Sequence, residues 1–289
     1  MRARSVVALA VLAALLASEG CASAARVASS DSFAFPIDSV RTESLAPGIV
    51  HRSIRMATGP WAIEVLAVTL DRCTTALAVK GVASSEGRER TSVLLTRLAD
   101  SASVLGGVNA DFFSFTPPGV PTGVLVARGR MLSPPSSRPV FAVDSLGVPH
   151  ILVLQRTADT LVPFHPIEAV GGRPVIVRDG QVSTEATDTN AFATTRHPRT
   201  AVGITTDGHL LLVVVDGRQP SFSVGMSLAE LADLMRGLGA HEALNLDGGG
   251  STTMVARDPA SGELRIVNRP SDKAGERPVG DALAVVRRC

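Results

Sequence analysis

Glycine and proline interrupt this chain so often that long regular helices have little room in it. The 289 residues include 26 glycines and 18 prolines, and the apolar runs between them have the length and composition of β-strands. Helical segments do not alternate regularly with these runs. Residues 46–289 contain no internal repeat and no low-complexity linker. The sequence therefore predicts one strand-rich, mixed α+β domain over 46–289, with a few packed helices.

Three segments carry clear secondary-structure signals. Residues 61–70 have apolar side chains on both alternating faces, which predicts a strand buried on both sides. Residues 199–206 and 209–216 flank Asp207-Gly208, a sequence that favours a β-hairpin. Ser227-Leu-Ala-Glu230 has the spacing of a capping box, and leucines follow it at helical intervals. We therefore expect a helix to begin at that point.

The N-terminus has the pattern of an export signal. Arg2 and Arg4 precede an apolar run from Val6 to Ala17, which is too short to span a bilayer comfortably. We assign residues 1–20 to a signal peptide. Residues 21–45, rich in serine and alanine, are expected to form a tether that leads into the first strand. The protein is therefore predicted to be exported.

The three cysteines bear on the fate of the chain after export. Gly20-Cys21 resembles a lipoprotein processing site, whereas Ala22-Ser23-Ala24 is an ordinary cleavage site. A membrane anchor on lipidated Cys21 and release into the periplasm or the medium both stay open. If Cys21 carries lipid, Cys73 and Cys289 remain as a pair, and disulfides persist in exported proteins. We predict a Cys73–Cys289 disulfide, with two unpaired thiols as the alternative.

Charge and missing motifs argue against several function classes. The formal net charge is +1, without the basic excess of a nucleic-acid-binding protein. The chain has no P-loop, no HExxH, no GxSxG and no GxGxxG motif. This argues against P-loop nucleotide hydrolysis, zincin proteolysis and ordinary serine esterase chemistry. The three scattered cysteines have no zinc-site spacing, and we expect no cofactor and no bound metal.

The most distinctive local segment is Asn245-Leu-Asp-Gly-Gly-Gly-Ser-Thr-Thr253. Asp247 ends an apolar strand, and Gly248, Gly249 and Gly250 permit close approach of the backbone to a ligand. Consecutive N–H groups in such a turn can form an anion-binding nest, to which Ser251 and Thr252 add hydroxyl donors. The alternative is a tight turn between two strands that Asp247 caps.

A second polar segment comes after the strand predicted near 104–109. Asn109 and Asp111 alternate there, so both side chains should point to one face, where an amide and a carboxylate suit sugar hydroxyls. The alternative is an Asx turn. The charged loop 268–281 is a further candidate segment, although solvation is the ordinary role of such a loop and is what we expect here.

Two further motifs place arginines beside strand ends. His197-Pro-Arg-Thr200 and Asp216-Gly-Arg218 bring Arg199 and Arg218 near apolar strands. Arginine recognises phosphate through paired hydrogen bonds, although a surface ion pair is the ordinary role of such a residue. Because Asp111, Asp216 and Asp247 all come after apolar strands, the motifs together suggest glycoside chemistry on an anionic substrate.

At these residues the chain resembles the phosphodiester glycosidase family, over roughly residues 60–286. The matching blocks are 108–113, 121–131, 171–180, 197–255 and 267–286. One departure is Ala110-Asp111, where many members have glycines before the paired phenylalanines. The resemblance implies an enzyme that hydrolyses a sugar-1-phosphodiester at the anomeric carbon and releases free sugar and a phosphomonoester. An envelope or extracellular phosphoglycan is the expected substrate.

The resemblance also suggests roles for the candidate residues. Asp247 or Asp216 would act at the anomeric carbon, with Asp111 as the third catalytic candidate. The phosphate would be held by Arg199, the backbone of Gly248 to Gly250, Ser251 and Thr252. Asn109 would bind sugar hydroxyls. The remaining substrate-binding candidates are Thr200, Arg218 and Asn245.

Two other functions remain open at this point. The first is a metal-dependent hydrolase in which Asp111, Asp216 and Asp247 bind Ca²⁺ or Mg²⁺. The second is a non-catalytic envelope protein that binds glycan or takes part in exopolysaccharide assembly. The low aromatic content, 3%, counts against a sugar-binding platform.

Overall fold

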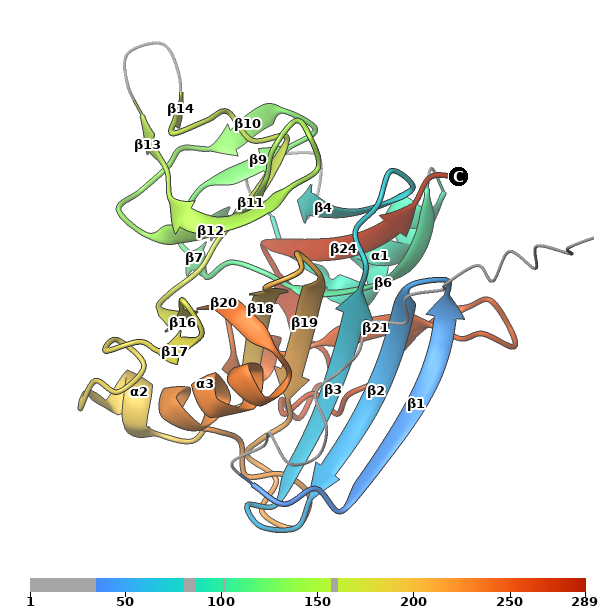
Figure 1. Ribbon diagram of the computed structural model, residues 1–289, viewed down its shortest axis with the longest axis vertical. Helices are drawn as coiled ribbons and strands as arrows, with labels where there is room; N and C mark the ends of the chain where they lie inside the picture. The colour runs from blue at the N-terminus through green and yellow to red at the C-terminus, as the bar shows by residue number, and fades with distance from the viewer. Residues whose placement is uncertain (1–34, 81–86, 101, 157–160) are drawn as a thin grey trace, which may run out of the picture.

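Strands dominate the fold, which is built from stacked sheets with helices on the outer sides (Figure 1). The structure is a computed structural model and describes residues 35–80, 87–100, 102–156 and 161–289. The predicted strand-rich α+β character is thus broadly correct, although sheet accounts for more of the chain than that label suggests.

The largest sheet has eight strands, and every pair of adjacent strands within it is antiparallel. Their order across the sheet is β1 (Ser39–Ala46), β2 (Ile49–Met56), β3 (Trp61–Val68), β19 (Leu210–Val215), β18 (Arg199–Thr205), β20 (Ala240–Asn245), β16 (Val175–Arg178) and β17 (Gln181–Val182). The hairpin predicted around Asp207-Gly208 joins β18 to β19 and is confirmed.

Two five-stranded sheets complete the main architecture. One runs in the order β22 (Leu264–Ile266), β21 (Met254–Arg257), β6 (Ser103–Asn109), β24 (Asp281–Arg287) and β4 (Thr74–Lys80). The other runs in the order β10 (Arg130–Ser133), β9 (Leu125–Ala127), β15 (Glu168–Gly171), β11 (Pro139–Val143) and β12 (Pro149–Val153). Three short pairs join β5 (Glu89–Arg90) to β23 (Pro278–Val279), β7 (Phe113–Phe115) to β8 (Pro118–Pro121), and β13 (Gln155–Arg156) to β14 (Leu161–Val162).

One hydrophobic core joins the three large sheets. It contains Leu66 from β3, Val108 from β6 and Phe141 from β11, all fully buried. The opposite face of the eight-stranded sheet packs against α3 (Leu228–Gly237) and α2 (Ala191–Thr194). Similarly, α1 (Thr91–Ala99) covers the outer face of the sheet that contains β6. Burial on both faces explains why strands such as β3 are apolar throughout, and every residue of β3 is buried as predicted.

The ends of two elements show how local sequence sets them. Ser227 caps α3 by accepting from the Glu230 backbone N–H, and the Glu230 side chain accepts from the Ser227 N–H, so the predicted capping box is confirmed. Near the N-terminus, residues 39–45 of the segment assigned to a tether lie in β1. The predicted signal peptide and Cys21 lie outside the described residues. None of the described helices has the length and apolar character needed to cross a membrane.

The predicted Cys73–Cys289 disulfide is confirmed. The two Cα atoms are 5.2 Å apart, and the bond joins residues separated by 216 positions. Cys73 precedes β4 and Cys289 comes after β24, its antiparallel neighbour. The bridge therefore fastens the C-terminal end of β24 to an adjacent edge strand.

We expect loss of this bond to destabilise the fold without changing it. Closing so long a loop in the unfolded chain corresponds to about 5 kcal/mol by chain entropy, and measured losses are typically about 2–5 kcal/mol. Cys289→Ser should therefore lower Tm by several degrees, measured by thermal unfolding followed by circular dichroism. The Cys73→Ser/Cys289→Ser double variant serves as the control. A double variant that is much less stable than the single one would show that the lost stability does not come from the bond.

Candidate active site

The amide of Asn109 joins the ends of β6 and β20. Its Nδ2 donates to the Asp247 carbonyl at 2.6 Å, and its Oδ1 accepts from Thr200 Oγ1 at 2.9 Å and from the Thr253 N–H at 3.1 Å. The Asp247 N–H in turn donates to the Ala110 carbonyl at 2.9 Å. Asn109 is fully buried. The structure therefore places it beneath the glycine-rich turn as a support, and not at the surface where a sugar hydroxyl would bind.

Two buried carboxyl groups meet where β6 and β24 pair. Asp281 Oδ1 accepts from the Asp111 N–H at 2.8 Å, and Asp111 Oδ2 accepts from the Gly123 N–H at 2.6 Å. Asp111 is 1% exposed and Asp281 is 0% exposed. The second oxygen of each group, Asp111 Oδ1 and Asp281 Oδ2, is buried without a hydrogen-bond partner. Such orphan oxygens are costly unless the groups carry a proton or a ligand.

Burial dominates the electrostatics of this cluster. It raises the pKa of Asp111 to about 7, opposed by the Gly123 hydrogen bond and the Arg138 charge and increased by repulsion from Asp247. Burial and then repulsion from Asp111 raise the pKa of Asp281 well above its usual range. Burial also raises the pKa of Asp247 to about 6. At neutral pH the Asp111–Asp281 pair therefore holds a proton, while Asp247 is mostly ionised.

The three glycines after Asp247 lie in a crowded turn, which includes the short 3₁₀ helix Gly249–Ser251. Gly249 has a φ of +63°, which favours glycine. A Cβ on Gly250 would lie 2.2 Å from both Arg277 Nη2 and Asp272 Oδ1. A Cβ on Gly249 would lie 3.0 Å from Arg218 Nη2. The glycines thus let two guanidinium groups lie directly on the turn.

Three arginines border the turn that carries Asp247. Arg218 is exposed beside Gly249, and Arg277 is partly exposed and forms an ion pair with Asp272 through contacts of 2.8 and 3.1 Å. Arg173 is exposed, and its guanidinium carbon lies 5.2 Å and 5.0 Å from the ring centres of Phe112 and Phe192. The charges of Arg277 and Arg173 lower the pKa of Asp247 against the effect of burial. An anion beside Asp247 would therefore meet several positive charges.

Arg199 has another task. Its Nε donates to the Met226 carbonyl at 2.8 Å, and its Nη2 donates to the Phe192 and Thr195 carbonyls at 2.9 Å. The residue is 2% exposed, and burial, followed by repulsion from Arg218, lowers its pKa to about 10. Arg199 therefore fastens the α2 segment to the sheet through its Nε and Nη2 groups.

Asp216 shares an edge of the sheet with Asp247 but not its surroundings. β19 and β20 run parallel with β18 between them, so their ends are separated by roughly 10 Å. Asp216 Oδ1 accepts from Asn268 Nδ2 at 2.9 Å, and both carboxylate oxygens accept from the Arg269 N–H at 3.0–3.1 Å. Burial and then repulsion from Glu64 raise its pKa to about 6. Asp216 thus anchors the loop that comes after β22.

The other sequence-predicted polar residues lie in the buried layer under the turn. Asn245 Nδ2 donates to the Arg173 carbonyl at 2.6 Å, and the Thr200 and Thr252 hydroxyl oxygens are 3.4 Å apart. Ser251 is fully buried. Gly248 is the N-cap of the 3₁₀ turn. These residues shape the turn from below.

Sequence reasoning missed four charged residues of this region. Asp281 and Arg277 lie in the loop 268–281 that we expected to be solvated, and that expectation is wrong for Asp281, which is fully buried. The apolar strand that starts at Asp281 is the sequence feature that could have indicated this burial. Arg138 and Arg173 each precede a proline and gave no pattern of their own, because only the tertiary fold brings them to the ends of β6 and β20.

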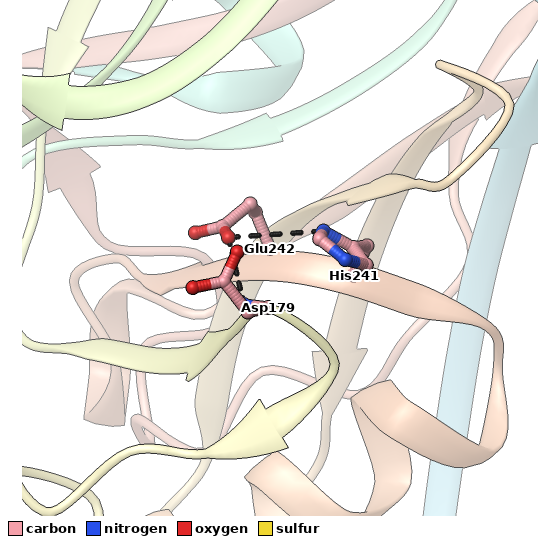
Figure 2. Close-up of side chains that lie close together, drawn as sticks. All are labelled: Asp179, His241 and Glu242. Carbon is pink, nitrogen blue, oxygen red and sulfur yellow. Dashed lines mark hydrogen bonds and ion pairs between the residues drawn. The ribbon is translucent and has the colours of Figure 1, made fainter.

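One group of possible metal ligands lies elsewhere. The ligand atoms of Asp179, His241 and Glu242 lie within 4.8 Å of one another, and the other described residues contain no comparable group of three (Figure 2). His241 and Glu242 lie at the start of β20, at the opposite end of the strand from Asp247. The Asp111, Asp216 and Asp247 set proposed for a metal-dependent hydrolase is not assembled, because Asp216 faces Asn268 and Arg269.

Removing one carboxyl group should show how much the buried Asp111–Asp281 pair destabilises the fold. Because folding raises these pKa values, the fold binds protons between about pH 4 and pH 7, and the pair's stability contribution is lost as the pH rises through that range. Asp281→Asn keeps the acceptor for the Asp111 N–H and supplies a donor in place of the orphan oxygen. We expect it to raise the free energy of unfolding at pH 8 by about 1–3 kcal/mol, with little gain at pH 5.

Urea denaturation at the two pH values measures this effect. The matched control is Glu263→Gln, which changes an exposed carboxylate and should change stability at neither pH. An equal loss of stability at pH 5 and pH 8 in Asp281→Asn would contradict the assignment of a repulsive pair.

Comparison with known proteins places this arrangement in a family. Residues 102–286 match the phosphodiester glycosidase family. The chain is 28% identical over 163 residues to mouse N-acetylglucosamine-1-phosphodiester alpha-N-acetylglucosaminidase, covering 51% of this chain and 31% of that protein. It is 34% identical over 110 residues to the SPbeta prophage-derived uncharacterized protein YomE of Bacillus subtilis, covering 38% of this chain and 16% of that protein. The matches thus span a third or less of these relatives.

Solved structures share the fold. The catalytic domain of zebrafish N-acetylglucosamine-1-phosphodiester alpha-N-acetylglucosaminidase, auto-inhibited by its pro-peptide, has a TM-score of 0.63 at 20% identity, covering 91% of this chain and 87% of that one. A hypothetical protein from Synechocystis has a TM-score of 0.68 at 16% identity, and the match covers 86% of this chain and 64% of that one. Because the family match covers well over half of the chain and includes the turn that carries Asp247, this protein belongs to the phosphodiester glycosidase family of enzymes.

Proposed function

We propose that the protein hydrolyses a sugar-1-phosphodiester at the anomeric carbon, releasing free sugar and a phosphomonoester. The observation that carries this proposal is the position of Asp247, a half-buried and mostly ionised carboxylate on a turn bordered by Arg173, Arg218 and Arg277. A carboxylate suits the anomeric carbon, and the arginines suit the phosphate attached to it. The family match supports the same reaction class.

The proposed reaction depends on the charges of Asp247 and of the arginines around it. In one route Asp247 acts as base toward a water molecule, which attacks the anomeric carbon as the bond from that carbon to the phosphate oxygen breaks. In the other route the Asp247 carboxylate attacks the carbon as that bond breaks, and water then hydrolyses the glycosyl–enzyme ester. A departing phosphomonoester is already a stable anion, so it needs little protonation. Arg173, Arg218 and Arg277 would stabilise its growing charge. The Asp111–Asp281 pair stays protonated beneath and limits the negative charge that the substrate meets.

The compartment and substrate class form a second part of the proposal. The Cys73–Cys289 disulfide supports an oxidising, extracytoplasmic environment, and the N-terminal sequence pattern supports export. An envelope or extracellular phosphoglycan is then the substrate class within reach. Lipid on Cys21, as an anchor of the enzyme to a membrane, belongs to this same proposal.

Two aspartate variants distinguish the catalytic carboxylate from the structural one. Asp247→Asn should lower kcat by about 10² or more, because an amide can neither attack nor accept a proton, while the protein stays folded. Asp216→Asn is the matched control. The pKa of Asp216 is also raised to about 6, but its carboxylate accepts hydrogen bonds from Asn268 and Arg269. We expect Asp216→Asn to lower stability more than kcat.

Sugar release from a panel of sugar-1-phosphodiesters, with and without EDTA, measures these effects. Full kcat in a folded Asp247→Asn protein would overturn the assignment. Activity that EDTA abolishes would favour the metal-dependent alternative. No sugar release by the wild type across a broad panel would favour glycan binding or assembly.

The pH profile should reflect two sets of carboxyl groups. Asp247 must lose its proton, so kcat/KM should rise as the pH increases through about 6. Above about pH 7 the Asp111–Asp281 pair loses its proton, and the added negative charge repels an anionic substrate, so kcat/KM should fall again. Asp281→Asn should weaken the alkaline decline and retain the acid limb. A wild-type profile that stays flat from pH 5 to pH 9 would contradict both assignments.

A further inference from the structure

Three arginines converge on an open pocket far from Asp247. The pocket has a volume of about 590 Å³ and is lined by Arg128, Arg287 and Arg288, with Leu77, Ala102, Ser103 and Cys289. Arg287 and Arg288 come from the end of β24, and Arg128 comes from the turn between β9 and β10. None of the three forms an ion pair with another residue among those that the structure describes. Like charges gathered in this way favour an anionic occupant.

The fold fixes the backbone that carries these side chains. The Arg288 N–H donates to the Cys73 carbonyl at 2.8 Å, next to the disulfide between Cys73 and Cys289. Arg128 has a φ of +53°, and its N–H donates to Glu168 Oε1 at 3.1 Å. Arg287 is partly engaged, because it donates to the Cys289 and Pro47 carbonyls at 3.3 and 3.4 Å. Arg128 and Arg288 therefore remain as exposed guanidinium groups on a fixed support.

Two carboxyl groups balance only part of this charge. Arg287 interacts electrostatically with Asp71, which is exposed, and Glu168 lies beside Arg128. Glu168 is 2% exposed, and its two oxygens accept from the backbone N–H groups of Ala78 and Arg128. Burial raises its pKa to about 7, opposed by those hydrogen bonds and by Arg288 and Arg128. Near neutral pH the pocket keeps a net positive charge.

We propose that this pocket is a second anion-binding site, which takes a phosphate group between Arg128 and Arg288. Guanidinium groups bind phosphate oxygens through paired, charge-assisted hydrogen bonds. β24 connects the pocket to the active site, with Asp281 at one end and Arg287 at the other. At about 3.4 Å per residue the two sites are roughly 20 Å apart. A phosphate at that distance belongs either to a distant unit of a polymeric substrate or to a free phosphate ion.

Titration with inorganic phosphate, followed residue by residue by amide NMR at low ionic strength, tests the site without measuring activity. The Ser103 and Arg288 amides should shift and saturate. Arg288→Gln should weaken this binding about tenfold or more. Arg130→Gln is the matched control, since Arg130 is exposed on the neighbouring strand β10 and does not line the pocket; it should change binding less than about twofold. Absent shifts, or equal weakening in both variants, would overturn the proposal.

A kinetic comparison then identifies the source of the phosphate, and this arm rests on the proposed function. The substrates are a single sugar-1-phosphodiester and an oligomer of several phosphodiester-linked sugars. If KM for the oligomer alone rises about tenfold in Arg288→Gln, the occupant is a distant phosphate of the substrate. If phosphate binding is lost and neither KM changes, the occupant is a free phosphate ion. If the wild type cleaves neither substrate, the proposed function fails, while the NMR result still decides the site.

Discussion

The candidate site depends on one buried amide. Asn109 donates to the Asp247 carbonyl and accepts from Thr200 and Thr253, so it ties the end of β6 to the turn after β20. These strands belong to different sheets, and the core that the sheets share is apolar and packs without directional bonds. Directional hydrogen bonds at this point fix how the two sheet ends face each other. The position of Asp247 is a consequence of that junction.

The same junction sets the protonation states. Where the sheets meet, Asp111 and Asp281 lie in a region from which water is excluded, and desolvation penalises each negative charge. The Ser251 hydroxyl, Arg277 and Arg173 lower the pKa of Asp247 against the effect of burial, so its pKa is raised only to about 6. Carboxyl groups on adjacent strand ends therefore differ in charge at neutral pH. This separation of protonated and ionised acids is typical of catalytic sites, and it is costly for the stability of the fold.

Local sequence patterns predicted the elements well and the site only in part. The β18–β19 hairpin and the capping box of α3 depend on neighbouring residues, and both were correctly predicted. The role of Asn109 was not, because an amide that binds a ligand and one that joins two sheets look identical in sequence. Asp281 was missed for a related reason. Its burial results from the pairing of β24 with β6, a contact between residues far apart in the chain.

The arginines show why exposure matters as much as charge. Arg199 has the sequence context of a phosphate ligand, yet backbone carbonyls accept from its Nε and Nη2 and the residue is buried. Arg277 is bound to Asp272, but both side chains are 31% exposed, and an ion pair so accessible to solvent contributes only about 0–1 kcal/mol. A phosphate near Asp247 can therefore compete with Asp272 for Arg277 at low cost. Arg277 thus lies on the turn and is accessible to solvent there.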